Sequence, residues 1–167
     1  HDNQIYGLTK GQASPTTMVG MKTPTQPWGV FEEPFNPVAL AIAMNASFVA
    51  RTFMGYFRES VGIIKKAIQH KGLAIVDILH PCVSFNRVNT YAWYREHTYW
   101  MEDGPFDRET AFRRAIETDP LPLGVFYISE RPTFEESVPA YRTDKRPLWK
   151  REPELEKVEA FFGARRG

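Results

Sequence analysis

The N-terminal stretch carries several oxygen atoms of the kind that hold a hard cation against a phosphate group. Asn3 offers a side-chain amide oxygen and Ile5 a main-chain carbonyl. Hydroxyl groups follow along the same stretch, at Thr9, Ser14 and Thr16. Mg²⁺ prefers such oxygen ligands. Because Gly7 and Gly11 allow the backbone to approach a ligand closely, the stretch indicates either a phosphate-binding loop or an ordinary polar turn.

The first residues read as the end of a strand that leads into this loop. In open α/β sheets, ligands bind outside the carboxyl ends of the strands. Strand alternation would place Asn3 and Ile5 on one side, as two ligands of one ion require, and Asp2 on the other. Asp2 is therefore a weaker candidate for binding a cation than Asn3 and Ile5; the alternative is that Asn3 only caps a turn.

The order of residues in this stretch resembles a known cofactor motif. Asp2-Asn3 is followed by Tyr6-Gly7-Leu8-Thr9-Lys10-Gly11-Gln12 and Ser14-Pro15-Thr16. This pattern closely resembles the thiamine-diphosphate loop of 2-oxoacid:ferredoxin oxidoreductase beta subunits. Further matching stretches include Asn36-Pro37, Phe48-Val49-Ala50-Arg51, His70-Lys71-Gly72, Asn89-Thr90-Tyr91 and Pro132-Thr133-Phe134-Glu135-Glu136. The resemblance covers most of the chain, to about residue 140.

The resemblance implies a role for each residue of the loop. The Asn3 side chain and the Ile5 carbonyl would bind Mg²⁺. The residues that would lie against the diphosphate and the thiazolium ring are Asn3, Ile5, Tyr6, Gly7, Leu8 and Thr9. Leu8 would also wall the substrate pocket; the alternative is a turn leucine that rests on the core. No residue of the chain is assigned as a catalytic acid or base.

The single cysteine lies in a second matching stretch, Pro81-Cys82-Val83-Ser84-Phe85-Asn86. A lone cysteine is usually a small buried hydrophobic residue. In similar beta subunits, however, this position supplies the fourth ligand of a 4Fe–4S cluster, which needs four thiolates in all. The resemblance therefore implies that Cys82 binds such a cluster, with the other ligands outside this chain.

The sequence lacks the Gly-Asp-Gly motif that forms the first half of the family's thiamine signature. We interpret the chain as the C-terminal portion of a beta subunit, which would not form a complete cofactor site alone. An alpha subunit, or alpha and gamma subunits, would complete the enzyme.

The resemblance implies the oxidative decarboxylation of a 2-oxoacid, either 2-oxoglutarate or pyruvate. Coenzyme A would accept the acyl group to give acyl-CoA and CO₂, and ferredoxin would accept the electrons. Two alternatives stay open. One is a thiamine enzyme without redox chemistry, of the decarboxylase or acetolactate type, and the other is a non-catalytic interaction subunit.

Composition excludes several other classes of function. The net charge of +1 gives no reason to expect a nucleic acid or a membrane surface as partner. No apolar run approaches the ~20 residues of a membrane-spanning helix. A single cysteine excludes an internal disulfide framework and is typical of a reducing compartment, so we expect a cytoplasmic protein.

The apolar pattern predicts an α/β fold with a mostly parallel sheet flanked by helices. Residues 1–141 would form the C-terminal part of a thiamine-diphosphate-binding domain, and residues 142–167 a charged tail. Strands are predicted at 47–53, 73–79 and 123–128, and helices at 37–44, 56–70, 109–117 and 154–162. The aromatic-rich residues 90–101 are expected to be partly helical.

Two of these helices carry specific signals. Asn36 and Pro37 are a typical N-cap and first residue of a helix whose apolar composition predicts burial. In the helix at 56–70, an apolar stripe runs along one face at Phe57, Val61, Ile64 and Ile68.

Overall fold

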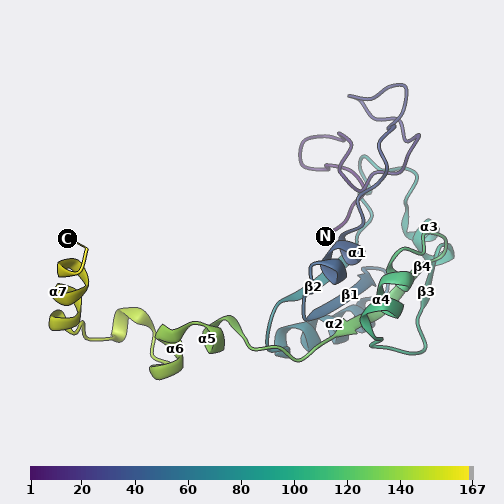
Figure 1. Ribbon diagram of the computed structural model, residues 1–167. Helices are drawn as coiled ribbons and strands as arrows, with labels where there is room; N and C mark the ends of the chain where they lie inside the picture. Colours follow the sequence, from purple (N-terminus) through teal and green to yellow (C-terminus); the bar gives the residue numbers. More distant parts are fainter. Residues whose placement is uncertain (166–167) are drawn as a thin grey trace. The chain divides into compact units, whose positions relative to one another are not determined.

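The computed structural model describes residues 1–165 of the chain. It divides into two compact units, His1–Arg131 and a second that begins at Pro132 (Figure 1). The domain boundary predicted after residue 141 lies inside the second unit and stays a prediction. Each unit is described by itself below.

A four-stranded sheet forms the centre of the first unit, with the strand order β2-β1-β4-β3. The strands are β1 (Phe48–Phe53), β2 (Ala74–Leu79), β3 (Thr98–Trp100) and β4 (Leu121–Ile128). β1 runs parallel to β2, and β3 runs parallel to β4. β1 and β4 are antiparallel, so the sheet is mixed and the predicted α/β class is confirmed with one antiparallel pairing.

Helices cover both faces of this sheet (Figure 1). They are α1 (Pro37–Ala43), α2 (Phe57–Gln69) and α4 (Arg108–Ala115). Successive residues of a strand point to opposite faces. Val49 of β1 packs with α1 and α4, whereas its neighbours Phe48 and Ala50 pack with Ile63 of α2.

Helix α1 begins as predicted. The Asn36 Oδ1 atom accepts a hydrogen bond from the Ala39 N–H at 3.0 Å, and Pro37 occupies the first helical position. The expected burial holds for only one face, because Leu40 and Met44 are exposed while Val38 and Ile42 are fully buried.

The apolar stripe predicted for α2 is not the face that packs on the sheet. Phe57 and Ile68 are 65% and 77% exposed. The buried residues of the helix are Ser60 and Ile63. The Ser60 hydroxyl donates to the Phe53 carbonyl at 3.0 Å, so a small polar side chain brings the helix close to β1. Periodicity located the helix, but not the face that packs on the sheet, which carries Ser60 and Ile63.

Residues 90–101 contain a helix and an unpredicted strand. Thr90 caps α3 (Tyr91–Glu96), and β3 follows directly. Tyr94 of α3 is completely buried with Phe53, Leu79 and Leu123 in a core cluster between the sheet and the N-terminal loops. Because β3 is only three residues long, it carries no alternation that would have revealed it.

The second unit consists of short helices. These are α5 (Phe134–Ser137), α6 (Pro139–Thr143), the 3₁₀ helix η1 (Leu148–Lys150) and α7 (Leu155–Gly163). The helix predicted at 154–162 is confirmed as α7, shifted by one residue. Among residues 1–165, no helix combines the length and apolarity that a membrane span requires.

Candidate functional site

The N-terminal segment enters the site alongside β2. Asp2 and Leu79 form a single parallel bridge. The Asp2 N–H donates to the Ile78 carbonyl at 2.8 Å, and the His80 N–H donates to the Asp2 carbonyl at 2.8 Å. The loop that follows therefore leaves the sheet at the carboxyl end of β2, which is also where the Cys82 loop begins.

The extended strand expected through Ile5 ends earlier. Gln4 adopts φ +52°, in the left-handed region, so the chain turns there instead of alternating. Strand alternation therefore does not apply across Gln4, and the assignment of Asn3 and Ile5 as ligands of one ion stays a prediction. Asp2 holds this turn, because its Oδ1 atom accepts hydrogen bonds from the Gln4 N–H and the Thr16 hydroxyl.

Asp2 belongs to the scaffold of the loop. Burial, and secondarily the negative charge of Asp77, raise the pKa of the Asp2 carboxyl above its usual range. Asp77 forms a buried ion pair with Arg51, at 2.8 Å between the Arg51 Nε and the Asp77 Oδ2 atoms. The loop thus starts from a buried cluster of charged side chains, in which the Asp2 carboxylate is already engaged by hydrogen bonds.

The two proposed metal ligands keep free oxygen atoms. The Asn3 side chain donates through Nδ2 to the His80 carbonyl at 2.6 Å. Within the described part of the chain, the Asn3 Oδ1 atom and the Ile5 carbonyl accept no hydrogen bond. An amide oxygen and a main-chain carbonyl form a donor set that fits Mg²⁺. The Asn3 Nδ2 bond to His80 also fits the alternative of a structural role at this turn, so the metal-ligand assignment stays a prediction.

Residues Tyr6–Gln12 form a tight hairpin. Tyr6 and Gln12 pair in an antiparallel bridge, and Gly11 adopts φ +102°, a conformation that favours glycine. Leu8 at the tip is 98% exposed. The alternative that Leu8 rests on the core of this chain is therefore wrong, and its side chain is free to face a ligand or another subunit.

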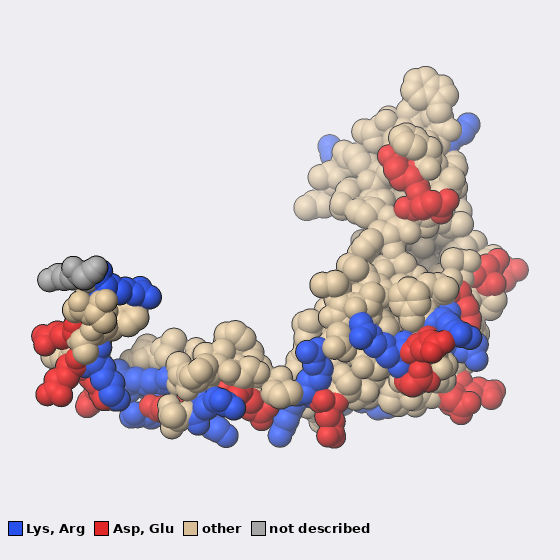
Figure 2. Space-filling view, viewed as in Figure 1, with Lys and Arg blue, Asp and Glu red and all other residues tan. Residues whose placement is uncertain are grey.

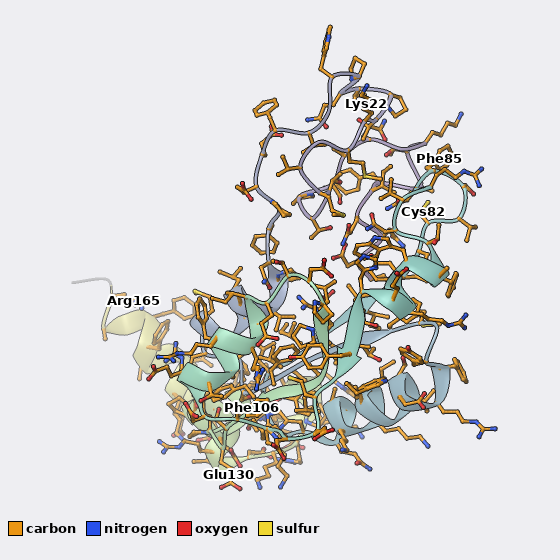
Figure 3. All side chains as sticks on the ribbon, turned by 90° about the vertical axis from the view of Figure 1, so that its right-hand side faces the viewer. Lys22, Cys82, Phe85, Phe106, Glu130 and Arg165 are labelled. Atoms are coloured by element: carbon orange, nitrogen blue, oxygen red, sulfur yellow. The ribbon has the colours of Figure 1, made fainter. Side chains whose placement is uncertain are left out.

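This hairpin packs directly against the Cys82 loop. A Cβ atom built on Gly7 would lie 3.1 Å from the Cys82 Sγ atom. A Cβ atom on Gly11 would lie 3.3 Å from Phe85. Figure 3 shows Cys82 and Phe85 on the loop beside the N-terminal loops. Two glycines therefore allow the proposed diphosphate loop to touch the only thiol of the chain.

Asn86 ties the same two loops together by hydrogen bonds. Its backbone N–H donates to the Cys82 carbonyl at 2.9 Å, and its side-chain Nδ2 donates to the Asn3 carbonyl at 3.2 Å. The sequence placed Asn86 in the Cys82 stretch but predicted no role for it. An asparagine four residues after Cys82 is consistent with a turn, but this spacing does not predict the hydrogen bond to Asn3.

A separate cleft of about 360 Å³ lies between the N-terminal loops and the sheet. Its lining includes Thr16, Met18, Phe35, Arg51 and Trp93. Neither Gly7 nor Cys82 borders it. Among the described residues, no group of three His, Cys, Asp or Glu side chains gathers into a metal site.

Comparison with protein families assigns consecutive parts of the chain to two families. Residues 1–78 match the thiamine pyrophosphate enzyme, C-terminal TPP binding domain. Residues 82–143 match the C-terminal family of the pyruvate ferredoxin oxidoreductase beta subunit. The first match contains the hairpin at Tyr6–Gln12, and the second begins at Cys82.

Relatives of known function carry related names. The 2-oxoacid:ferredoxin oxidoreductase subunit beta of a Sulfolobus species is 39% identical over 155 residues, covering 84% of this chain and 51% of the relative. Subunit beta of 2-oxoacid:ferredoxin oxidoreductase 1 from Aeropyrum pernix is 39% identical, covering 88% and 52%. The chain thus spans about half the length of the curated relatives it matches.

A solved structure has the same fold. It is 2-oxoglutarate:ferredoxin oxidoreductase from Magnetococcus marinus, with 2-oxoglutarate, coenzyme A and succinyl-CoA bound. It superposes with a TM-score of 0.85 at 31% sequence identity, covering 96% of this chain and 55% of that chain.

Proposed function

Because the chain belongs to the beta subunits of the 2-oxoacid:ferredoxin oxidoreductases, we propose that it holds the Mg²⁺–diphosphate end of thiamine diphosphate and supplies one ligand to a 4Fe–4S cluster. The observation that carries this proposal is the contact between Gly7 and Cys82. Gly7 lies in the part of the chain that matches a thiamine-binding family, and Cys82 lies in the part that matches a ferredoxin oxidoreductase family. The contact therefore connects the two parts.

In the thiamine site, the Asn3 Oδ1 atom and the Ile5 carbonyl would hold Mg²⁺, and the hairpin Tyr6–Thr9 would bind the diphosphate and the thiazolium ring. The free oxygen atoms of Asn3 and Ile5 and the exposed tip at Leu8 support this assignment. Leu8 lies at the wall of the 2-oxoacid pocket. When bound, thiamine diphosphate supplies the carbanion chemistry, and the protein anchors and orients it.

Cys82 contributes one thiolate to the cluster. The chain has a single cysteine, and a 4Fe–4S cluster needs four thiolates, so the remaining ligands lie outside these residues. Its half-buried position beside the glycine hairpin supports a cluster ligand close to the thiamine loop. Cys82 would hold the cluster that accepts electrons from the 2-oxoacid.

The assembled enzyme oxidatively decarboxylates a 2-oxoacid, either 2-oxoglutarate or pyruvate, with coenzyme A and ferredoxin. The names of the relatives support a 2-oxoacid and ferredoxin. The succinyl-CoA in the Magnetococcus marinus structure supports coenzyme A as acyl acceptor and 2-oxoglutarate as the substrate to test first.

The exposed apolar surface of the first unit supports association with an alpha subunit, or with alpha and gamma subunits. Around the hairpin, Leu8, Trp28 and Phe31 are 98%, 93% and 79% exposed. The charged residues from Tyr6 to Phe35 are Lys10, Lys22, Glu32 and Glu33. Figure 2 shows this part of the surface as mostly uncharged. A surface of this kind is typical of a protein–protein interface.

Two substitutions in the purified multi-subunit enzyme test the assignment. Asn3→Ala removes a metal ligand, so we expect the affinity for Mg²⁺–thiamine diphosphate to fall by about tenfold or more while the iron content is unchanged. Cys82→Ser removes a thiolate, so we expect the cluster absorbance and iron content to fall while thiamine is retained. Ser84→Ala, at an exposed position of the same loop, is the matched control.

The same preparations separate the alternatives. Reduction of a viologen dye by 2-oxoglutarate and coenzyme A supports the oxidoreductase. Bound thiamine without iron supports a thiamine enzyme without redox chemistry, and an assembly that contains neither supports an interaction subunit. An unchanged iron content in Cys82→Ser would remove the cluster assignment.

A further inference from the structure

Asn86 is buried, with 2% of its surface exposed, and uses its whole side chain in hydrogen bonds. Its Oδ1 atom accepts from the Val88 N–H at 3.0 Å and from the Asn89 N–H at 2.9 Å. Its Nδ2 atom donates to the Asn3 carbonyl at 3.2 Å and to the Asn89 Oδ1 atom at 3.0 Å. A buried amide with two donors and two acceptor positions is thereby fully satisfied.

These bonds allow one orientation of the amide. Two backbone N–H groups lie on one side of it, so that side must carry the oxygen, and the nitrogen must face Asn3. A hydrogen bond from the Asn86 backbone N–H to the Cys82 carbonyl closes the turn that precedes Asn86. Asn86 therefore bonds directly to both the Cys82 turn and the Asn3 main chain, in addition to the bonds that His80 makes with Asp2 and Asn3.

We propose that Asn86 is a positioning residue that couples the thiamine site to the iron–sulfur cluster. This inference rests on the proposed function, since it takes Asn3 as a metal ligand and Cys82 as a cluster ligand. Asn86 bonds to the backbone carbonyls of both residues, and its own side-chain polar atoms are all used in hydrogen bonds within the protein. A displacement of Asn3 when Mg²⁺–thiamine diphosphate binds is transmitted through Asn86 to the Cys82 turn, and so alters the environment of the cluster.

The coupling is tested in the purified holoenzyme with Asn86→Asp. The carboxylate keeps the acceptor for the Val88 and Asn89 N–H groups but places an oxygen against the Asn3 carbonyl. We expect thiamine diphosphate to dissociate about tenfold faster after Mg²⁺ chelation. We also expect removal of thiamine to change the electron paramagnetic resonance spectrum of the reduced wild-type cluster, and this change to be lost in Asn86→Asp.

Asn89→Asp is the matched control. Asn89 is as buried as Asn86, and its Oδ1 atom would still accept from Asn86. The substitution removes only a donor to the Met18 sulfur and no bond to Asn3. We expect this variant to keep the wild-type dissociation rate and the thiamine-dependent spectral change. Equal effects of Asn86→Asp and Asn89→Asp would mean that burying a carboxylate, not the bond to Asn3, is responsible, and would overturn the inference.

The remaining outcomes separate this inference from the proposed function. If Asn3→Ala releases thiamine and Cys82→Ser loses iron while Asn86→Asp behaves as wild type, the function stands and the coupling is wrong. If neither of the first two variants has an effect, the proposed function itself fails. Should Asn86→Asp not assemble, Asn86→Ser provides the test, because a serine hydroxyl can cap the turn but lacks the reach to Asn3.

Discussion

The approach of Gly7 to Cys82 leaves little room for an additional methyl group, so the cysteine side chain would have to shift. An added Cβ atom would lie 3.1 Å from the sulfur, closer than ordinary van der Waals contact. Gly7 is not among the glycines with positive φ, so its backbone would accept an alanine and the constraint is purely steric. The glycine is therefore needed for contact between the two loops rather than for the shape of the hairpin.

Gly7→Ala should consequently disturb the cluster that we propose at Cys82. Overpacking costs typically about 1–3 kcal/mol, and here the flexible cysteine side chain is the group that must move. We expect a lower iron content and an altered electron paramagnetic resonance spectrum of the reduced cluster in the assembled enzyme, with the assembly itself intact.

Gly62→Ala is the control for this substitution. Gly62 is an exposed residue of α2, and an added Cβ atom would meet nothing within 4 Å. In a helix interior, alanine is favoured over glycine by roughly 0.5–1 kcal/mol, so this variant should be slightly stabilised with a wild-type cluster. A wild-type spectrum for Gly7→Ala would contradict the assigned contact.

At the scale of elements, Asn36 joins two helices on the same face of the sheet. Its Oδ1 atom caps the start of α1, and its Nδ2 atom donates to the Ala115 carbonyl at the end of α4, at 2.7 Å. An N-cap asparagine is common, but the second bond depends on how the helices pack. One residue therefore bonds to a backbone N–H of α1 and to a backbone carbonyl of α4, neither of which has a partner within its own helix.

Asn36→Asp separates these two roles. Aspartate keeps the cap but loses the donor to Ala115, so we expect the assembled enzyme to lose roughly 0.5–1.5 kcal/mol of stability. Asn36→Ala loses the cap as well, at an additional cost of about 0.5–2 kcal/mol. Unfolding midpoints in urea, followed by far-UV circular dichroism, measure both.

The control is the reverse substitution, aspartate to asparagine, at the N-cap of α4. Asp107 caps that helix by accepting from the Glu109 and Thr110 N–H groups and has no bond to another helix. Asp107→Asn should therefore have little effect. If Asn36→Asp unfolds at the wild-type urea concentration, the bond to Ala115 contributes nothing.

Helix α2 presents different apolar side chains to two surfaces. Ile63 packs with Phe48 and Ala50 of β1, whereas Phe57 and Ile68 of the apolar stripe are exposed. Most of the exposed apolar surface of the helix therefore lies away from the sheet. In an assembled enzyme, this exposed apolar surface of α2 is a second candidate for contact with another subunit.

At the scale of the molecule, the first unit contains the core that positions the site. The three core clusters consist of residues between Val38 and Tyr127. In the second unit, large apolar side chains are exposed, with Phe134 at 71%, Trp149 at 80% and Leu155 at 68%. We therefore predict that the first unit determines folding around the site, whereas the exposed apolar side chains of the second unit contribute to assembly.

Deletion of residues 132–167 tests this division. Because the core lies elsewhere, we expect the shortened protein to keep the iron and thiamine of the assembled enzyme, with a reduced yield of the complex on co-purification with the partner subunits. Replacing Trp149 and Leu155 with serine in the full chain is the milder control and should weaken assembly in the same direction. Loss of both cofactors at a normal assembly yield would contradict the division.

Local signals in the sequence determined most of the elements. The donor roles of Asn3 and Ile5 followed from the family resemblance and stay predictions, whereas the Asn36 cap and the helix at 56–70 followed from residue types and short-range spacing. Such features depend on interactions within a few residues, and therefore they can be read without knowing what lies on the other side of the fold.

The tertiary structure decided the features that depend on register between distant segments. Examples are the antiparallel pairing of β1 with β4, the turn at Gln4, the rotation of α2 and the contacts that Gly7 and Asn86 make across the two loops. Periodicity encodes which residues share a face, but not which surface that face meets. The proposed link between the thiamine loop and Cys82 arises only because the pairing of Asp2 with the end of β2 brings both loops to one edge of the sheet.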